Sequence, residues 1–270
     1  MVVLPPASRP AAGPASRGEG RRPDARTTAF APYASPLTRP CAEPRRPAEP
    51  SGVWRPGAAA APGSPLARVV ADSRDVEEWL AARAAGVTAS DAAKLATPNS
   101  VRGVVRDKLA GGQFTGNAYT DFGREREPRI AAWMRERHGI PPSTSLFHAE
   151  ASRRHLATPD GLHCEEDGAV LLAEIKTTNK EWSRIPRAYL RQVYWQQYVL
   201  GASRTLFVWE RHEDFVVRDP EPRCTWIERD EAEIARLVGL AKLVLAELDR
   251  HRDAIECSLE AHAAGIDGRG

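Results

Sequence analysis

Thr158-Pro159-Asp160-Gly161 and Glu174-Ile175-Lys176 are the two stretches that decide the fold of this sequence, and Glu174 stands fourteen positions after Asp160. The second stretch lies in an apolar run and is typical of a central, buried strand, on which Glu174 and Lys176 point to the same face. A buried carboxylate and a buried ammonium group are costly unless they pair with each other or bind a metal ion. An acidic residue at a turn followed by Glu-x-Lys on a strand indicates a metal-dependent phosphodiesterase site. Taken alone, Glu-x-Lys is also typical of an ordinary ion pair on a solvated edge strand.

Residues 1–66 differ in composition from the rest of the 270-residue chain. They hold 14 of the 22 prolines and show neither helical nor strand periodicity. Such a segment cannot bury enough apolar surface to offset the conformational entropy that folding removes. We therefore predict a disordered Pro/Ala/Arg-rich tail over residues 1–66 and one α/β domain over residues 67–270.

Charge is distributed unevenly between these two parts. The tail carries nine arginines and four acidic residues, a net charge of +5, whereas the remainder has 29 basic and 32 acidic residues, a net charge of −3. A domain of this charge fits a nucleic-acid enzyme if its carboxylates gather at a metal site. The arginines of the tail would add a weak, salt-sensitive attraction to phosphates. The alternative is a start region that carries no selected function.

Several classes of protein are excluded by the sequence. The apolar run at residues 1–4 is too short for a signal peptide, and no run approaches the length of a membrane span. We therefore expect a cytoplasmic protein without a membrane partner. The cysteines lie too far apart for a zinc knuckle or an iron–sulfur nuclease of the Cas4 or AddB type. They are Cys41, Cys164, Cys224 and Cys257.

Periodicity and helix breakers predict helices first, then strands alternating with helices. The predicted helices cover residues 72–85, a short stretch capped by Thr88 or Ser90, and residues 101–109, 118–138, 186–200 and 230–251. The predicted strands cover residues 145–149, 154–157, 169–177, 205–211 and 215–218. We expect Asp72 or Ser73 to cap the first helix and Pro128 to cause a kink or a restart near Glu127 in the long one. These elements predict a central mixed sheet flanked by helices.

Six short motifs occur in an order that resembles one nuclease family. They are Trp79-Leu80-x-x-Arg83, Gly86-Val87-Thr88-Ala89-Ser90-Asp91-Ala92-Ala93, Gly123-x-x-x-Glu127-Pro128, Pro159-Asp160-Gly161, Glu174-Ile175-Lys176-Thr177 and Gln192-Val-Tyr-Trp-Gln196. Each motif is weak alone. Together, over residues 78–209, they resemble the YqaJ-type viral recombinases and lambda-type phage exonucleases of the PD-(D/E)xK nuclease superfamily.

The resemblance implies a role for each matching residue. Asp160, Glu174, the carbonyl of Ile175 and the helix carboxylate of Glu127 would bind a metal ion. Lys176 would activate or orient the attacking water, and Gln192 would position groups of the site. Arg83 and Ser90 would hold a terminal 5′-phosphate. Oxygen ligands of this kind suit Mg²⁺ or Mn²⁺ rather than zinc.

Each of these residues also has a plainer interpretation. Glu127 fits an exposed helix charge, and Asp160-Gly161 fits a simple turn. Gln192 and Gln196 share one helix face that could be solvent-exposed, and Ser90 fits a helix cap. We expect the histidines and aromatic residues near the motifs to be structural. These are His148, His155, His163, Tyr189, Tyr194, Trp195 and Tyr198.

The function that we predict is metal-dependent hydrolysis of DNA phosphodiesters, as a 5′→3′ exonuclease on linear duplex DNA in phage-type recombination. A structure-specific endonuclease of the same fold and a non-catalytic DNA-binding recombination module are the alternatives. Duplex DNA is the predicted partner. The resemblance also allows a single-strand annealing protein and a homo-oligomer, which no residue pattern here indicates. Polarity, processivity and the biological pathway are not determined by the sequence.

Overall fold

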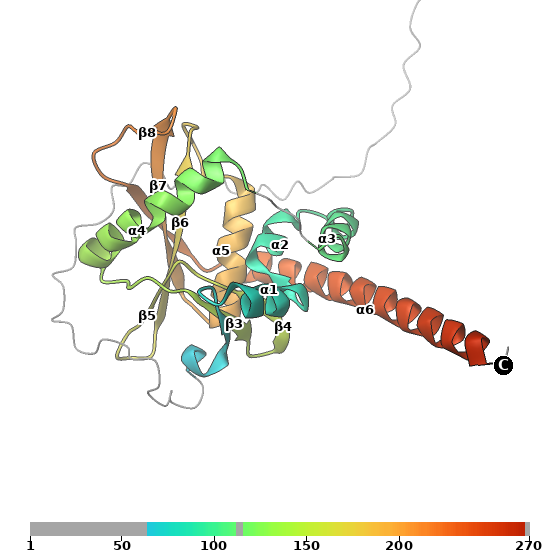
Figure 1. Cartoon of the computed structure of the whole chain (residues 1–270). Helices are drawn as coiled ribbons and strands as arrows, with labels where there is room; N and C mark the ends of the chain where they lie inside the picture. The colour runs from blue at the N-terminus through green and yellow to red at the C-terminus, as the bar shows by residue number, and fades with distance from the viewer. Residues whose placement is uncertain (1–63, 112–115, 268–270) are drawn as a thin grey trace, which may run out of the picture. The chain divides into compact units, whose positions relative to one another are not determined.

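The computed structural model describes residues 64–111 and 116–267, and within these it describes side chains up to residue 258. Two mixed sheets and six α-helices make up this part of the chain (Figure 1). The helices are α1 (Val76–Ala84), α2 (Ala89–Lys94), α3 (Ser100–Leu109), α4 (Ala118–His138), α5 (Arg187–Leu200) and α6 (Glu231–Asp267). The predicted tail over residues 1–66 falls almost wholly outside the described residues. At its predicted end, Ser64 caps a short 3-10 helix, η2 (Pro65–Arg68), which includes residues 65 and 66.

The first sheet has the strand order β1-β3-β4-β2. Its strands are β1 (Val69–Asp72), β2 (Val87–Thr88), β3 (Ser145–Ala149) and β4 (Ser152–Ala157). The parallel pairing of β2 with β4 brings the segment between α1 and α2 onto this sheet. Gly86 makes that approach feasible, because a Cβ atom there would lie 2.3 Å from the carbonyl oxygen of Arg154.

The second sheet holds five strands, with β6 and β7 parallel at its centre. Its strands are β5 (Gly161–Cys164), β6 (Val170–Thr178), β7 (Arg204–Glu213), β8 (Val216–Val217) and β9 (Arg223–Glu228). The predicted mixed sheet between helices is therefore confirmed, and the structure divides its strands between two sheets. The chain turns at Asp160, whose N–H donates to the carbonyl of Ala173 at 3.1 Å. This turn leads into β5, which pairs with β6. Along the chain, β5 therefore lies between β4 of the first sheet and β6 of the second.

Helix boundaries follow the capping residues. The predicted span of α4 is confirmed, and Gly139 ends it in the left-handed conformation with φ of 70°. Of the predicted kink or restart near Glu127, the restart is wrong, because α4 continues through the exposed Pro128. The predicted start of α1 is also wrong. Asp75 caps it, while Asp72 ends β1 and binds Arg74.

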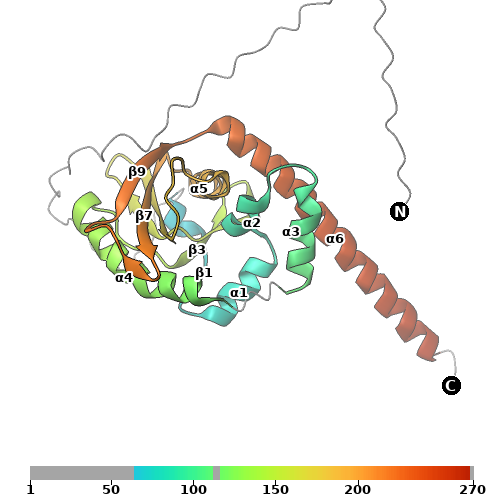
Figure 2. The same ribbon diagram turned by 90° about the horizontal axis from the view of Figure 1, so that it is seen from above.

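Two layers of helices enclose the second sheet. From above, β7 and β9 lie between α4 on one side and α5 on the other (Figure 2). Ile130 and Met134 of α4 pack against one face of β6 and β7. Trp195 of α5 packs in a larger core that includes residues of both sheets, and its indole N–H donates to Leu156 of β4 at 3.0 Å. The position of α5 between the two sheets is what orients the polar residues on its inner face.

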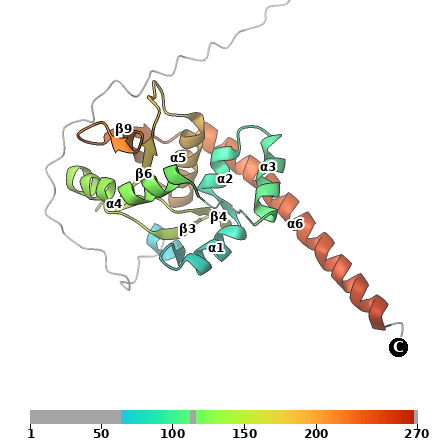
Figure 3. The ribbon, with the colours of Figure 1, turned by 45° about the horizontal axis from the view of Figure 1, so that its top comes forward.

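Helix α6 extends further than predicted, to Asp267 rather than His251. Its first half packs on the core through Leu237 and Val244, and residues 251–258 are exposed. All three ribbon views show it running past α3 and away from the sheets (Figure 3). No helix within the described ranges has the length and apolar character needed to span a bilayer.

Candidate active site

The candidate site lies where β6 extends beyond the end of β5. Strand β5 pairs with β6 only as far as Ala173, so the next residues of β6 have an open edge on that side. Asp160 occupies this edge, and its Oδ2 accepts a hydrogen bond from the backbone N–H of Ile175 at 2.6 Å. Because the N–H and C=O of one strand residue point to the same edge, the carbonyl of Ile175 also faces this side.

Glu174 lies on the face of β6 that α5 covers, and its side chain is 1% exposed. Lys176 and Gln192 donate to its Oε1, the latter at 2.5 Å, and Gln196 donates to its Oε2 at 2.6 Å. Both oxygens of this buried carboxylate are therefore engaged. Charge-assisted bonds of this kind hold the side chain in one orientation.

Asp160 is the residue whose ionisation is most disturbed. Burial raises the pKa of its carboxyl well above the usual value, and the nearby charge of Glu174 raises it further. Lys176 and the N–H of Ile175 act in the opposite direction, and Glu127 adds to the increase. The position is therefore unfavourable for a carboxylate until more positive charge is brought to it.

Lys176 is held as a cation by its neighbours. Burial alone would lower its pKa, but the charges of Glu174 and Asp160 outweigh that effect and raise it above the ordinary value. The ammonium nitrogen also lies 5.4 Å from the centre of the Tyr189 ring. Lys176 therefore remains protonated throughout the physiological range.

Glu127 reaches the same region from α4. Gly123, one turn earlier, approaches β6 so closely that a Cβ atom there would lie 3.2 Å from Oγ1 of Thr177. Burial of the carboxyl raises the pKa of Glu127, the charge of Lys176 opposes this, and the charge of Glu174 adds to it. The residue as a whole is exposed. The carboxyl of Glu127 therefore interacts electrostatically with the charges of Lys176 and Glu174, while the residue remains accessible to solvent.

The donor set fits Mg²⁺ or Mn²⁺. The carboxyl groups of Glu127, Asp160 and Glu174 lie within electrostatic reach of one ammonium group, on Lys176, so ionising all three would leave an excess of negative charge that a divalent cation would balance. Within the described residues no three His, Cys, Asp or Glu side chains form a closed cluster around one point. Mg²⁺ commonly binds one or two carboxylates and keeps several waters, so it does not require such a cluster.

The two residues predicted to hold a phosphate, Arg83 and Ser90, lie together. The guanidinium of Arg83 donates to Oγ of Ser90 at 3.4 Å and lies over the ring of Trp79, 4.1 Å from its centre. The indole N–H of Trp79 donates to Oγ1 of Thr158 at 3.2 Å, two residues before Asp160. A continuous series of contacts thus joins Arg83 to the loop that carries Asp160.

The start of α2 offers less to an anion than the sequence suggested. Thr88, one of the two caps considered, is the cap, and it forms a capping box with Asp91, which occupies the backbone N–H of Thr88. Ser90 is exposed. Asp91 is neutralised by Lys108 at 2.8 Å. Any phosphate bound here would therefore depend mainly on the side chains of Arg83 and Ser90.

Gln196 is a site residue that the sequence did not identify. The idea that it lies on an exposed face is wrong, since it is fully buried and donates to Glu174. The sequence pattern that could have identified Gln196 is its spacing of four residues from Gln192, which places both amides on one helix face. Its Oε1 is buried without a hydrogen-bond partner in the described structure. His155, predicted to be structural, is buried against Trp195 and bonded to the hydroxyl of Tyr198 at 2.9 Å.

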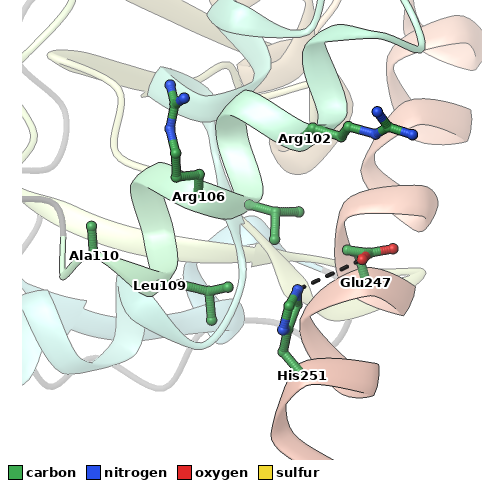
Figure 4. A pocket seen from close by; sticks show the side chains of 7 residues that line it. Arg102, Arg106, Leu109, Ala110, Glu247 and His251 are labelled. Atoms are coloured by element: carbon green, nitrogen blue, oxygen red, sulfur yellow. Dashed lines mark ion pairs between the residues drawn. The ribbon is translucent and has the colours of Figure 1, made fainter.

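A separate hollow of about 480 Å³ lies between α3 and α6 (Figure 4). Glu247 and His251 form an ion pair on its α6 side. Its lining residues are Arg102, Val105, Arg106, Leu109, Ala110, Glu247 and His251. None of them belongs to the site on β6, so this hollow is not the candidate active site.

Comparison with known proteins identifies similar sequences and structures. Residues 78–203 match the family described as YqaJ-like viral recombinase domain. The structure of LHK-Exo in complex with dAMP is 30% identical, covers 70% of this chain and 99% of its own, and has a TM-score of 0.54. Another structure of LHK-Exo, an alkaline exonuclease from Laribacter hongkongensis, is 29% identical with the same coverage and a TM-score of 0.52.

A more distant solved structure shares the fold alone. It is a phage-related exonuclease from Haemophilus somnus 129PT, with 14% identity, 63% coverage of this chain, 96% coverage of its own and a TM-score of 0.50. Among curated proteins no sequence matches significantly.

Proposed function

The chain belongs to the YqaJ-type family of viral recombinases and phage exonucleases, and from this premise we propose that it is a metal-dependent 5′→3′ exonuclease that degrades linear duplex DNA. Membership confirms the resemblance and the α/β nuclease fold predicted from the sequence. It also makes the protein a nuclease of the phage-recombination type that acts on DNA.

The observation that carries the proposal is the buried network around Glu174. A carboxylate that accepts hydrogen bonds from one lysine and two glutamines is held in place before any substrate arrives. Preorganised charged groups contribute most to catalysis, because they need no rearrangement as charge develops in the transition state. Packing alone gives no reason to bury this set of polar groups on a central strand.

In this proposal Asp160, Glu174 and the Ile175 carbonyl bind Mg²⁺ or Mn²⁺, and Glu127 contributes from α4. An ion held by these residues would lower the pKa of a bound water and would stabilise charge on the phosphate. The ammonium group of Lys176, kept charged by Glu174 and Asp160, orients the attacking water and faces the developing negative charge. Gln192 and Gln196 fix the carboxylate of Glu174.

Arg83 and Ser90 are proposed to bind the terminal 5′-phosphate. A terminal phosphate carries more charge than an internal one, so it gains more from a guanidinium. The contacts through Trp79 and Thr158 support the proposal, because they tie Arg83 to the loop of Asp160. LHK-Exo is solved with the mononucleotide dAMP, which supports the release of single nucleotides as the reaction type.

The proposed substrate also bears on the partners, oligomeric state and location that we propose for the protein. Duplex DNA is the principal partner, and a single-strand annealing protein would use the strand that a 5′→3′ exonuclease leaves. A homo-oligomer around the duplex and a cytoplasmic location are consistent with this role.

The direct test is digestion of three DNA substrates by the wild-type protein with Mg²⁺ and with EDTA. We expect mononucleotides from 5′-phosphorylated linear duplex, slower release from 5′-hydroxyl duplex, and no cutting of covalently closed circles. Efficient nicking of circles would favour the endonuclease alternative. Binding of linear DNA without cleavage in any divalent metal would favour the non-catalytic one.

A further inference from the structure

Arg126, the residue before Glu127, forms a two-pronged ion pair with Glu210 of β7. Its Nε and Nη2 donate to Oε1 and Oε2 of Glu210, each at 2.7 Å. The Arg126 side chain is 17% exposed and that of Glu210 is 4% exposed. A bidentate pair between a planar guanidinium and a carboxylate tolerates only a narrow range of geometry. The pair therefore constrains the helix backbone that carries Arg126.

The position of this pair on the sheet places it beside the site. Glu210 lies opposite Thr177 in the register of β6 and β7, and Thr177 follows Lys176. Gly123 of α4 makes its close approach to the same Thr177. Helix α4 is thus held to β6 by a tight contact and to β7 by an ion pair, both within the turn that precedes Glu127.

Stability does not explain a buried ion pair at this point. Removing two charges from water costs about as much as their attraction returns, and apolar residues of similar size often serve as well or better. One and two turns further along, α4 covers the same sheet with Ile130 and Met134. An apolar contact was therefore available to this helix, and what the ion pair adds is directional geometry.

We propose that Arg126 and Glu210 are positioning residues, which set the distance and rotation of α4 so that the carboxylate of Glu127 stays beside Asp160, Glu174 and Lys176. This inference rests on the proposed role of Glu127 in metal binding. Neither Arg126 nor Glu210 touches the substrate in this account, and each acts through the helix that carries Glu127.

The test measures Mn²⁺ binding without DNA, by the electron paramagnetic resonance signal of free Mn²⁺, beside the cleavage rate. The variants are Arg126→Leu, Glu127→Gln and the combination of the two. Arg126→Leu leaves Glu210 buried without a partner, so Arg126→Leu/Glu210→Leu is included to remove both charges and preserve folding. Arg129→Leu, exposed on the same helix, is the matched control.

We expect Arg126→Leu/Glu210→Leu to weaken Mn²⁺ binding about tenfold, the usual effect of losing a group that orients a ligand. Adding Arg126→Leu to Glu127→Gln should cause no further loss, because both changes act through one carboxylate. Arg129→Leu should bind Mn²⁺ as the wild type does.

Two results would overturn the inference. If Glu127→Gln weakens Mn²⁺ binding but Arg126→Leu/Glu210→Leu does not, the positioning role is wrong and the proposed metal site stands. If Glu127→Gln binds Mn²⁺ and cleaves as the wild type does, the role of Glu127 is wrong and the positioning role fails with it.

Discussion

The two halves of the candidate site differ in how firmly the fold holds them. Glu174 is buried and accepts hydrogen bonds from residues of both β6 and α5. Arg83, by contrast, makes one long hydrogen bond to an exposed serine and rests on the ring of Trp79. The fold therefore holds the group around Glu174 in place, and we call it the rigid half, whereas the group around Arg83, the adjustable half, has fewer fixed contacts. Under the proposed function, cleavage would depend on preorganised groups, and the choice of DNA end would depend on a weaker, adjustable contact.

A large effect should come from Lys176→Ala in the rigid half. We expect cleavage to fall by about 10²- to 10⁴-fold, the range for a group that assists proton transfer, while DNA binding persists. Single-turnover digestion and a DNA-binding titration measure the two quantities. Lys180→Ala, exposed two residues after β6, is the control. A residual rate close to that of the wild type would remove Lys176 from the chemistry.

A smaller loss should follow from Gln196→Leu, which removes one donor to Glu174. We expect activity to fall by about 10- to 100-fold, as is usual when a ligand loses the group that orients it. Gln197→Leu is a matched control on the next residue of α5, since Gln197 is equally buried but donates to Thr205 and Ile227. It should lower the melting temperature and leave the activity of the folded protein intact. Equal activity losses in the two variants would mean that Gln196 matters only for packing.

For the adjustable half, we predict that a substitution changes the preference for 5′-phosphorylated ends and does not abolish cleavage. Arg83→Ala should reduce digestion of 5′-phosphorylated duplex by about tenfold or more, the worth of a hydrogen bond to a charged group. It should leave the slower digestion of 5′-hydroxyl duplex unchanged, so the two rates converge. Arg74→Ala, whose partner is Asp72, serves as the control. If Arg83→Ala lowered both rates equally, Arg83 would act in cleavage and not in the preference for 5′-phosphorylated ends.

Much of the architecture could be predicted, and the errors have physical causes. The bounds of α4 and β3 follow from local signals such as the glycine that ends α4. The placement of β4 and β6 in separate sheets was not predictable, because strand pairing depends on long-range register that adjacent residues do not encode. Strand β5 was missed because its four residues follow an Asp-Gly turn signal.

The residues of the candidate site likewise divide into those that the sequence predicts and those that it does not. The predicted residues on β6 and the Asp160 turn lie together, as their motif required. The burial of Gln196 and the Arg126–Glu210 pair could not be inferred, because each depends on which distant strand faces its helix.

A further prediction concerns the acid stability of the rigid half, through His155, which packs against α5. Burial, with the charges of Lys242 and Arg154, lowers the pKa of His155 to about 4, against about 6.5 in the unfolded chain. The folded state then binds fewer protons, so stability is complete above pH 6.5 and falls as pH decreases from 6.5 to 4, by about 3 kcal/mol in all. Urea unfolding at pH 7.5 and 4.5 should show this decrease in the wild type and a smaller one in His155→Gln. Equal decreases in both proteins would assign the acid sensitivity to other groups.

The most direct test of the central claim is Mg²⁺-dependent digestion of 5′-phosphorylated linear duplex by Asp160→Ala beside Glu166→Ala, an exposed acidic residue outside the site. The account predicts that Asp160→Ala cleaves at less than about one thousandth of the wild-type rate and Glu166→Ala at the full rate. Because Asp160 sits among like charges, its removal should leave the melting temperature unchanged or higher. Cleavage by Asp160→Ala at the wild-type rate would contradict the account.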